Sequence, residues 1–270
     1  MSPNRGEQKC GPPNNGDSIA MAHLHQIWFD LGSGSIPPHP TRRSAVRHMN
    51  PGLTYHLWSL PDARTLVARC YPQYVDLWNA LPHGINRADF FRYILMHRFG
   101  GAYLDLDFVC CKPFDSLLLS VTDTVVMGEE WPFSFRDATV HNGALVSTSP
   151  SHPFWLHVME EVRRRSVGGV DRGDIQESVF RLTGTAMLRD AAISYWGRRE
   201  ENRRFPVLVA PFFVFCPLSS RGALVTDYSE VPSKGSWNLP SKHDAHGMSS
   251  RPATFTFIAP AYKTWQKSFA

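Results

Sequence analysis

The stretch 85–113 constrains the fold of this chain more than any other, because it joins a helix, a double glycine and a strand. Apolar residues recur every three or four positions between 91 and 99, which predicts a helix with Asn86 as its N-cap. Glycine readily takes the left-handed conformation that closes a helix, so the glycines at 100–101 predict its end. The chain then reverses into a strand predicted for 102–109.

Two acids lie on that predicted strand. Because side chains alternate along a strand, Tyr103, Asp105 and Asp107 share one face. Two carboxylates a few ångströms apart beside apolar neighbours repel each other and lose hydration. A divalent cation such as Mg²⁺ or Mn²⁺ removes the conflict and leaves coordination positions open for phosphate oxygens. The pair therefore predicts a site for a metal and a diphosphate.

The Asp-x-Asp tripeptide alone is weak evidence for a metal site, because the composition predicts about one such tripeptide by chance in a chain of this size. Asp89 and Arg92 add context, since they lie three residues apart on one helical face and the double glycine brings that face back toward the acidic strand. Two interpretations remain. The residues form either an exposed ion pair contributing a few tenths of a kcal/mol or part of the same site, and the context favours the site.

The central stretch reads Arg-Ala-Asp-Phe-Phe-Arg-Tyr, then Phe-Gly-Gly-Ala-Tyr-Leu-Asp-Leu-Asp, then Lys-Pro. It resembles the sugar-binding region of glycosyltransferases with a DXD motif, in the group around family 32. That group includes fungal initiating mannosyltransferases, α-1,4-galactosyltransferases and capsular polysaccharide glycosyltransferases. The resemblance implies a metal-dependent, retaining hexosyltransferase that moves a hexose from a UDP- or GDP-sugar to an acceptor hydroxyl on a glycan, lipid or protein.

The resemblance also implies residue roles. Asp105 and Asp107 match the DXD pair, which would hold Mn²⁺ (or Mg²⁺) and through it the diphosphate of the nucleotide sugar. Asp89 and Arg92 match the upstream acid and base that contact the donor sugar and its phosphate. Tyr103 matches the aromatic residue two positions before the first metal-site Asp.

Other segments extend the resemblance. His-Gln-Ile-Trp-Phe looks like the family's opening strand, which implies that Trp28 stacks on the nucleotide base, although a core tryptophan is an equal alternative. Asn142, in His-Asn-Gly, matches a polar residue near the donor sugar and completes the predicted catalytic set. Two departures stand out. The segment 183–185 has Thr185 where relatives have proline, and the C-terminal Ser-Trp is replaced by Thr-Trp at 264–265, with His246 upstream.

Strands and helices are expected to alternate along the chain, which predicts an α/β fold. The resemblance specifies a GT-A type: one domain over 20–270 with a Rossmann-like, mostly parallel sheet flanked by helices. The donor site is expected at the carboxyl ends of the strands. The predicted strands cover residues 23–29, 53–58, 102–109, 121–128, 140–146, 207–210, 212–216 and 254–259. His23 and His25 share a face of the first, and with no third ligand nearby in sequence we expect packing, not metal binding.

Composition bounds the remaining properties. Residues 1–19 are predicted to be a disordered lead-in, and 219–251 a loop-rich insertion. The net charge of +4 comes from scattered basic residues, which argues against a nucleic-acid partner. No apolar run is long enough to predict a transmembrane segment, and neither a signal peptide nor a glycosylation sequon is evident. The five cysteines are odd in number and are expected to be reduced. A cytoplasmic location is the resulting prediction.

Two alternatives to a glycosyltransferase stay open. The run Asp-Leu-Asp-Phe-Val at 105–109 also fits the nucleophile motif of haloacid-dehalogenase-like phosphatases, with Asp105 as nucleophile. Such enzymes need a later lysine and an acidic pair, for which Gly173-Asp174 is only a partial match. The other alternative is a catalytically inactive protein that binds a nucleotide sugar or carbohydrate, because the C-terminal motif departs from the family.

Overall fold

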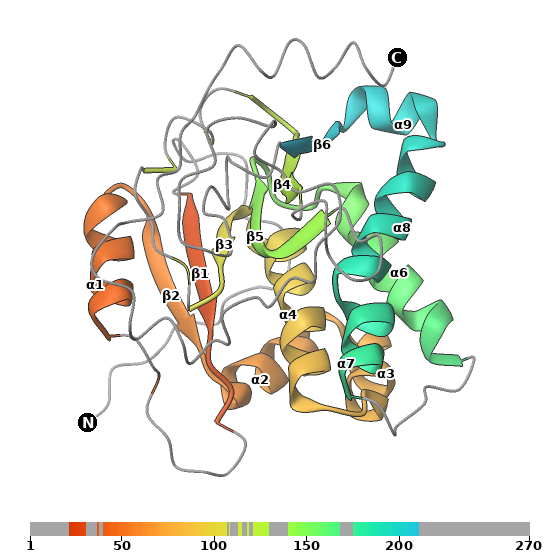
Figure 1. Cartoon of the computed structure of the whole chain (residues 1–270), viewed down its shortest axis with the longest axis horizontal. Coiled ribbons are helices and arrows are strands. Elements are labelled where there is room, and N and C mark those ends of the chain that lie inside the picture. The colour runs from red at the N-terminus through yellow and green to blue at the C-terminus, as the bar shows by residue number, and fades with distance from the viewer. Residues whose placement is uncertain are drawn as a thin grey trace, which may run out of the picture.

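The computed structural model describes residues 22–30, 37, 40–106, 108, 113–114, 118, 121–129, 140–167 and 175–210. They form a six-stranded sheet flanked by helices (Figure 1). The strands are β1 (His23–Ile27), β2 (Thr54–Trp58), β3 (Gly101–Leu104), β4 (Val125–Glu129), β5 (Val140–Ser147) and β6 (Val207–Ala210). The helices are α1 (Pro40–Met49), α2 (Leu60–Cys70), η1 (Pro72–Tyr74), α3 (Val75–Ala80), α4 (Gly84–Phe99), α6 (Pro153–Val167), α7 (Ile175–Ser178), η2 (Val179–Thr183), α8 (Thr185–Trp196) and α9 (Arg199–Arg204).

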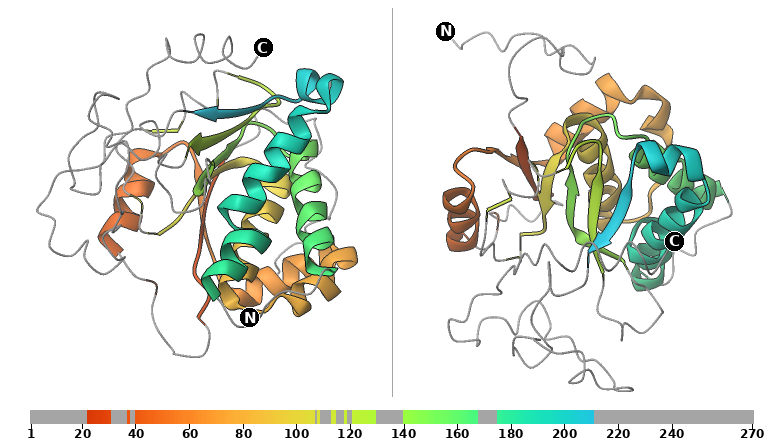
Figure 2. Two further views of the ribbon diagram at one scale, coloured as in Figure 1. Left: turned by 45° about the vertical axis from the view of Figure 1, so that its right-hand side comes forward. Right: turned by 90° about the horizontal axis from the view of Figure 1, so that it is seen from above.

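The sheet has the order β2-β1-β3-β5-β4-β6. The pairs β1–β2, β1–β3 and β4–β6 are parallel, and β5 runs antiparallel to both of its neighbours. The expected α/β fold, with a mostly parallel sheet flanked by helices, is confirmed, and the GT-A type stays a prediction. Figure 2 shows α1 on the side of the sheet away from α4, α6 and α8. Because the two faces are covered differently, the core divides into a large cluster under α4, α6 and α8 and a small one under α1.

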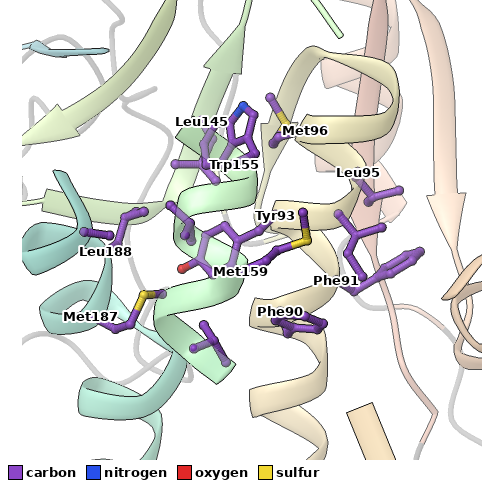
Figure 3. Packing of buried hydrophobic residues seen from close by; sticks show 14 of the residues in the cluster. Phe90, Phe91, Tyr93, Leu95, Met96, Leu145, Trp155, Met159, Met187 and Leu188 are labelled. Atoms are coloured by element: carbon purple, nitrogen blue, oxygen red, sulfur yellow. The ribbon is translucent and has the colours of Figure 1, made fainter. Parts of the chain in front are cut away.

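Helix α4 is the centre of the large cluster. It contacts the sheet on one side and α6 on another, so its apolar residues are buried around most of its circumference. Figure 3 shows Phe90, Phe91 and Tyr93 of α4 between the neighbouring elements, and the ring of Tyr93 stacks on Trp155 of α6 at 6.1 Å. The predicted N-cap role of Asn86 is wrong. The helix begins at Gly84, and the Asn86 side chain is buried inside the fold, where it binds another element.

The double glycine ends α4 as predicted. Gly100 and Gly101 have φ values of 64° and 83°, the left-handed region that favours glycine. A Cβ on Gly101 would lie 2.1 Å from the carbonyl oxygen of His23, so glycine also lets β3 approach β1. This turn directs the chain from α4 straight into the centre of the sheet.

Several strands are shorter than predicted, among them β1, which ends at Ile27. β3 ends at Leu104, because the Phe108 N–H donates to the Asp105 carbonyl at 3.1 Å and the chain turns there. Asp105 therefore lies just beyond the strand, at its carboxyl end. β4 begins at Val125, since Asp123 takes a left-handed turn with φ of 47°.

Several predictions concern residues outside the described ranges. These are the lead-in 1–19, Asp107, the pair 173–174, the strands 212–216 and 254–259, the insertion 219–251, His246 and the pair 264–265. The single-domain boundaries also stay a prediction. The structure has Cys70 in a disulfide, so the expectation of reduced cysteines is wrong for this residue. None of the helices in the described part has the length and apolar character needed to cross a membrane.

Candidate active site

Arg92 lies at the centre of a buried polar cluster. Its Nη2 is 2.6 Å from Oδ1 of Asp89, and its Nη1 donates to the backbone carbonyl of Asn142 at 2.6 Å. Nη1 also lies 3.3 Å from Oδ1 of Asp105. The guanidinium stacks over the ring of Tyr103, with its Cζ 4.7 Å from the ring centroid. The structure thus brings together five residues that the sequence predicted for the site.

Three elements position these side chains. Asp89 and Arg92 are one turn apart on α4, and Tyr103 lies on β3. The antiparallel ladder between β3 and β5 continues past the end of β3, where the N–H of Asp105 donates to the Gly143 carbonyl at 2.8 Å. That bond places Asn142, the preceding residue of β5, next to the arginine.

The exposed-pair interpretation of Asp89 and Arg92 is wrong. Their side chains are only 3% and 6% exposed. Burial acts against the charge on Arg92, but the Asp105 carboxylate, followed by Tyr103 and Asp89, raises its pKa overall. The guanidinium therefore stays charged in the interior, held by acids on two sides.

Tyr103 holds one oxygen of Asp105. Its hydroxyl donates to Oδ1 at 2.6 Å, the same oxygen that lies near Arg92. Burial raises the pKa of Tyr103 well above its usual value, so the hydroxyl stays protonated and acts as a donor. Oδ1 of Asp105 is thereby committed to the protein, while Oδ2 has no hydrogen-bond donor among the described residues.

Gly143 lets the backbone of β5 approach that second oxygen closely. A Cβ on this residue would lie 2.6 Å from Oδ2 of Asp105 and 2.5 Å from Cε1 of His141. The Asp105 side chain is 27% exposed. A partly exposed carboxylate whose second oxygen has no hydrogen-bond donor among the described residues suits a hard cation. The partner acid of the motif, Asp107, lies outside the described residues, and within them no group of three His, Cys, Asp or Glu residues is arranged to hold a metal.

Thr183 is a member of the cluster whose role the sequence left open. Its hydroxyl donates to Oδ2 of Asp89 at 3.0 Å and accepts from Nδ2 of Asn86 at 2.9 Å. Nδ2 of Asn142 lies 3.3 Å from the other oxygen of Asp89. Thr183 ends the π-helical turn η2, a geometry that often marks functional sites. The resemblance had singled out this segment, but the contact with Asp89 follows only from the tertiary structure.

Gln26 is a second residue that the sequence did not single out. Its fully buried side chain donates from Nε2 to the Asp105 carbonyl at 3.4 Å, and its Oε1 accepts from the Tyr55 hydroxyl at 2.9 Å. A buried polar residue in an apolar strand is the signal that would have indicated such a role.

Trp28 lies directly after β1 and is half-buried. The backbone N–H of Trp28 donates to the backbone carbonyl of Trp58 at 2.9 Å. The Trp28 side chain belongs to neither apolar cluster of the described residues. The core-tryptophan alternative therefore finds no support, and stacking on a nucleotide base stays a prediction.

The histidines of β1 have a third neighbour, His56 of β2. Nδ1 of His23 is 3.0 Å from Nε2 of His56. His25 accepts from the Trp58 indole at Nδ1 and donates from Nε2 to the Gly100 carbonyl. Both nitrogens of His25 are thus used within the protein. The rings of His23, His25 and His56 pack against one another and against Phe99, and the expectation that they bind no metal stays a prediction.

Residues 27–122 match the family model described as "Glycosyltransferase sugar-binding region containing DXD motif". Over these residues, about a third of the chain, the protein is similar to this family of glycosyltransferases. The Asp-x-Asp at 105–107 lies within the matched range, as do α4 and the double glycine.

Several named proteins are similar to the chain. One is inositol phosphoceramide mannosyltransferase 3 of Schizosaccharomyces pombe, 28% identical over 52% of this chain and 36% of its own length. Another is mannosyl phosphorylinositol ceramide synthase CSH1 of Saccharomyces cerevisiae, 30% identical over 58% of this chain and 41% of its own length. The chain thus spans about two fifths of these curated relatives. Among solved structures, the PaToxG glycosyltransferase aligns with a TM-score of 0.43 and 12% identity over 67% of this chain and 72% of its own.

Proposed function

We propose that this chain transfers a hexose from a nucleotide sugar to an acceptor hydroxyl, with a divalent cation at Asp105 and Asp107. The observation that carries the proposal is the buried Arg92, which is held between Asp89 and Asp105 at the carboxyl end of β3. Burying a charge is costly unless it is paired, and such preorganised charges are typical of sites where charge develops during a reaction.

The chain's own residues suggest a division of tasks. Arg92 would bind the donor diphosphate. Asp89 is 2% exposed and accepts from Arg92, Asn142 and Thr183, so we assign it chiefly to orienting the first two toward the donor. Trp28 would stack on the base.

The proposed cation fits the acidic turn. Oδ2 of Asp105 is uncommitted among the described residues, and it lies so close to Gly143 that a Cβ on this residue would crowd it. Asp107 would supply the second carboxylate. When bound, Mn²⁺ or Mg²⁺ would neutralise the charge that develops on the leaving diphosphate. Retention of anomeric configuration is implied by the family resemblance and stays a prediction.

The relatives' names suggest which substrates to test first. They describe mannosyl transfer to inositol phosphoceramide. We therefore propose mannose as the first sugar and a phosphorylated lipid as the first acceptor. Location stays a prediction, and the Cys70 disulfide removes one of the arguments for the cytoplasm.

Donor turnover tests the proposal directly. We would measure hydrolysis and transfer with a panel of UDP- and GDP-sugars in the presence of Mn²⁺. Asp107→Ala should abolish Mn²⁺-dependent donor binding without loss of the fold, because removing one acid from a repelling pair relieves repulsion in the metal-free protein. Asp76→Ala, at an exposed position on α3, is the matched control. Normal donor binding by the Asp107 variant would contradict the assignment.

The same preparation separates the alternatives. A phosphatase would form a covalent aspartyl-phosphate on Asp105, or its fluoroberyllate analogue, whereas a transferase would use this residue only as a ligand. Detection of the covalent species would overturn the proposal. Donor binding without either hydrolysis or transfer to any acceptor would instead indicate the inactive binding protein.

A further inference from the structure

Helix α1 presents an uncompensated positive charge beside the sheet. Its ten residues include three arginines and one histidine and no acid. Among the described residues, neither Arg43 nor Arg47 forms an ion pair with a carboxylate. The helix lies next to β2, on the face of the sheet away from α4 (Figure 1).

Arg43 is placed where a cation is unfavourable without an anion nearby. It lies in the first turn of α1, where the helix dipole favours negative charge. Its Nη2 donates to the Pro37 carbonyl at 3.3 Å, but its buried Nε has no hydrogen-bond acceptor among the described residues. A buried donor without a partner costs free energy and calls for an explanation.

Arg47 lies one turn further along the same face. Residues four apart on a helix are neighbours, and two like charges there repel each other. The Arg47 guanidinium lies 5.2 Å from the ring centroid of Tyr55, and Arg43 is close enough for its charge to act on the same tyrosine. Both cations thus lie beside Tyr55, although the helix offers no charge to balance them.

Tyr55 also connects this pair to the proposed donor site. Its hydroxyl donates to Gln26 at 2.9 Å, and Gln26 donates to the backbone carbonyl of Asp105 at 3.4 Å. Arg92 reaches Asp105 from α4, on the opposite side of the sheet from α1. The two basic sites therefore flank the same acidic turn.

We propose that Arg43 and Arg47 bind a phosphate ester carried by the acceptor. Arginine matches the oxygens of a phosphate with its planar fork of donors, and two arginines one turn apart can hold one phosphate between them. A bound phosphate would balance the repelling charges, and the dipole of α1 would favour an anion near Arg43. Naming the acceptor as the ligand rests on the proposed function, but the presence of the phosphate site does not.

Binding of phosphate probes, without donor or metal, tests the site. The full chain would be titrated with soluble glycerol 3-phosphate and sedimented with phosphatidylcholine vesicles that contain or lack phosphatidylinositol. We expect Arg43→Gln and Arg47→Gln each to weaken binding roughly tenfold, as loss of one charge-assisted contact predicts. Arg64→Gln makes the same change of charge at an exposed position of α2 and should leave binding unchanged.

Each result has a defined meaning. If the Arg43 and Arg47 variants bind the soluble ester, the vesicles or both more weakly than the unchanged protein does, the site is supported. The probe whose binding is weakened shows whether a free ester or a lipid headgroup fits the site. The proposal is overturned if the Arg64 control loses as much binding as the Arg43 and Arg47 variants, or if the unchanged protein binds none of the probes. Because the assay contains no donor, a chain that binds phosphate but fails to turn over nucleotide sugars would contradict only the proposed function.

Discussion

Replacing Arg92 by lysine tests the centre of the candidate site. The guanidinium serves Asp89 and the Asn142 carbonyl at 2.6 Å each, and Asp105 at 3.3 Å. Lysine keeps the charge but is a point donor, so it cannot span three acceptors on different elements. Losing one buried, charge-assisted hydrogen bond should cost about 2 kcal/mol of unfolding free energy. For a chain of this size that is a fall in melting temperature of roughly 4–8 °C.

The effect on turnover separates a structural role from a catalytic one. If Arg92 binds the donor diphosphate, turnover per folded molecule should fall on the order of 10²-fold, or about 2.7 kcal/mol of barrier. The assay is Mn²⁺-dependent donor hydrolysis well below the melting temperature, with urea unfolding measured on the same samples.

Arg165→Lys provides a matched control. Arg165 also joins three acceptors, at 2.7 Å each: Glu161, the Arg181 carbonyl and Asp190. It lies on α6 and makes no described contact with the cluster around Arg92. We expect its lysine variant to lose stability with unchanged turnover. If the two variants lose stability alike and both keep their turnover, Arg92 is a structural residue and the reasoning fails.

Other predictions follow from the same geometry. Gly143→Ala should weaken Mn²⁺-dependent donor binding about tenfold in a folded protein, because its Cβ would crowd Oδ2 of Asp105; unchanged binding would exclude a cation there. Thr183→Val should lower turnover and reduce the free energy of unfolding by about 1–3 kcal/mol, because Asp89 loses the hydrogen bond that it accepts from the Thr183 hydroxyl. Thr183→Ser keeps this hydroxyl and should restore both turnover and stability. Burial lowers the pKa of His152 to about 4, so the folded state holds this histidine neutral while the unfolded chain takes up a proton below 6.5. Stability should therefore fall as pH drops from about 6.5 to 4, and His152→Gln should flatten that slope in urea titrations.

Local features of the chain were readable in advance. The helical periodicity before the double glycine and the alternation after it predicted α4 and β3, because side-chain spacing reflects local backbone geometry. Short-range signals failed where long-range contacts compete with them. Asn86 reads as an N-cap, yet the fold uses its side chain to hold Thr183, 97 residues away.

The sequence by itself determined the fold class, the resemblance to a glycosyltransferase family and the residue types of the candidate site, since these depend on patterns within a few turns of the chain. Only the tertiary structure decided that Asp89 and Arg92 are buried and that Asn142 and Thr183 complete their hydrogen bonds. Burial is a property of the whole packed core, and no local pattern measures it. The same reason explains why Arg43, one more arginine in a basic helix, became distinctive only when its buried Nε was left without an acceptor in the described structure.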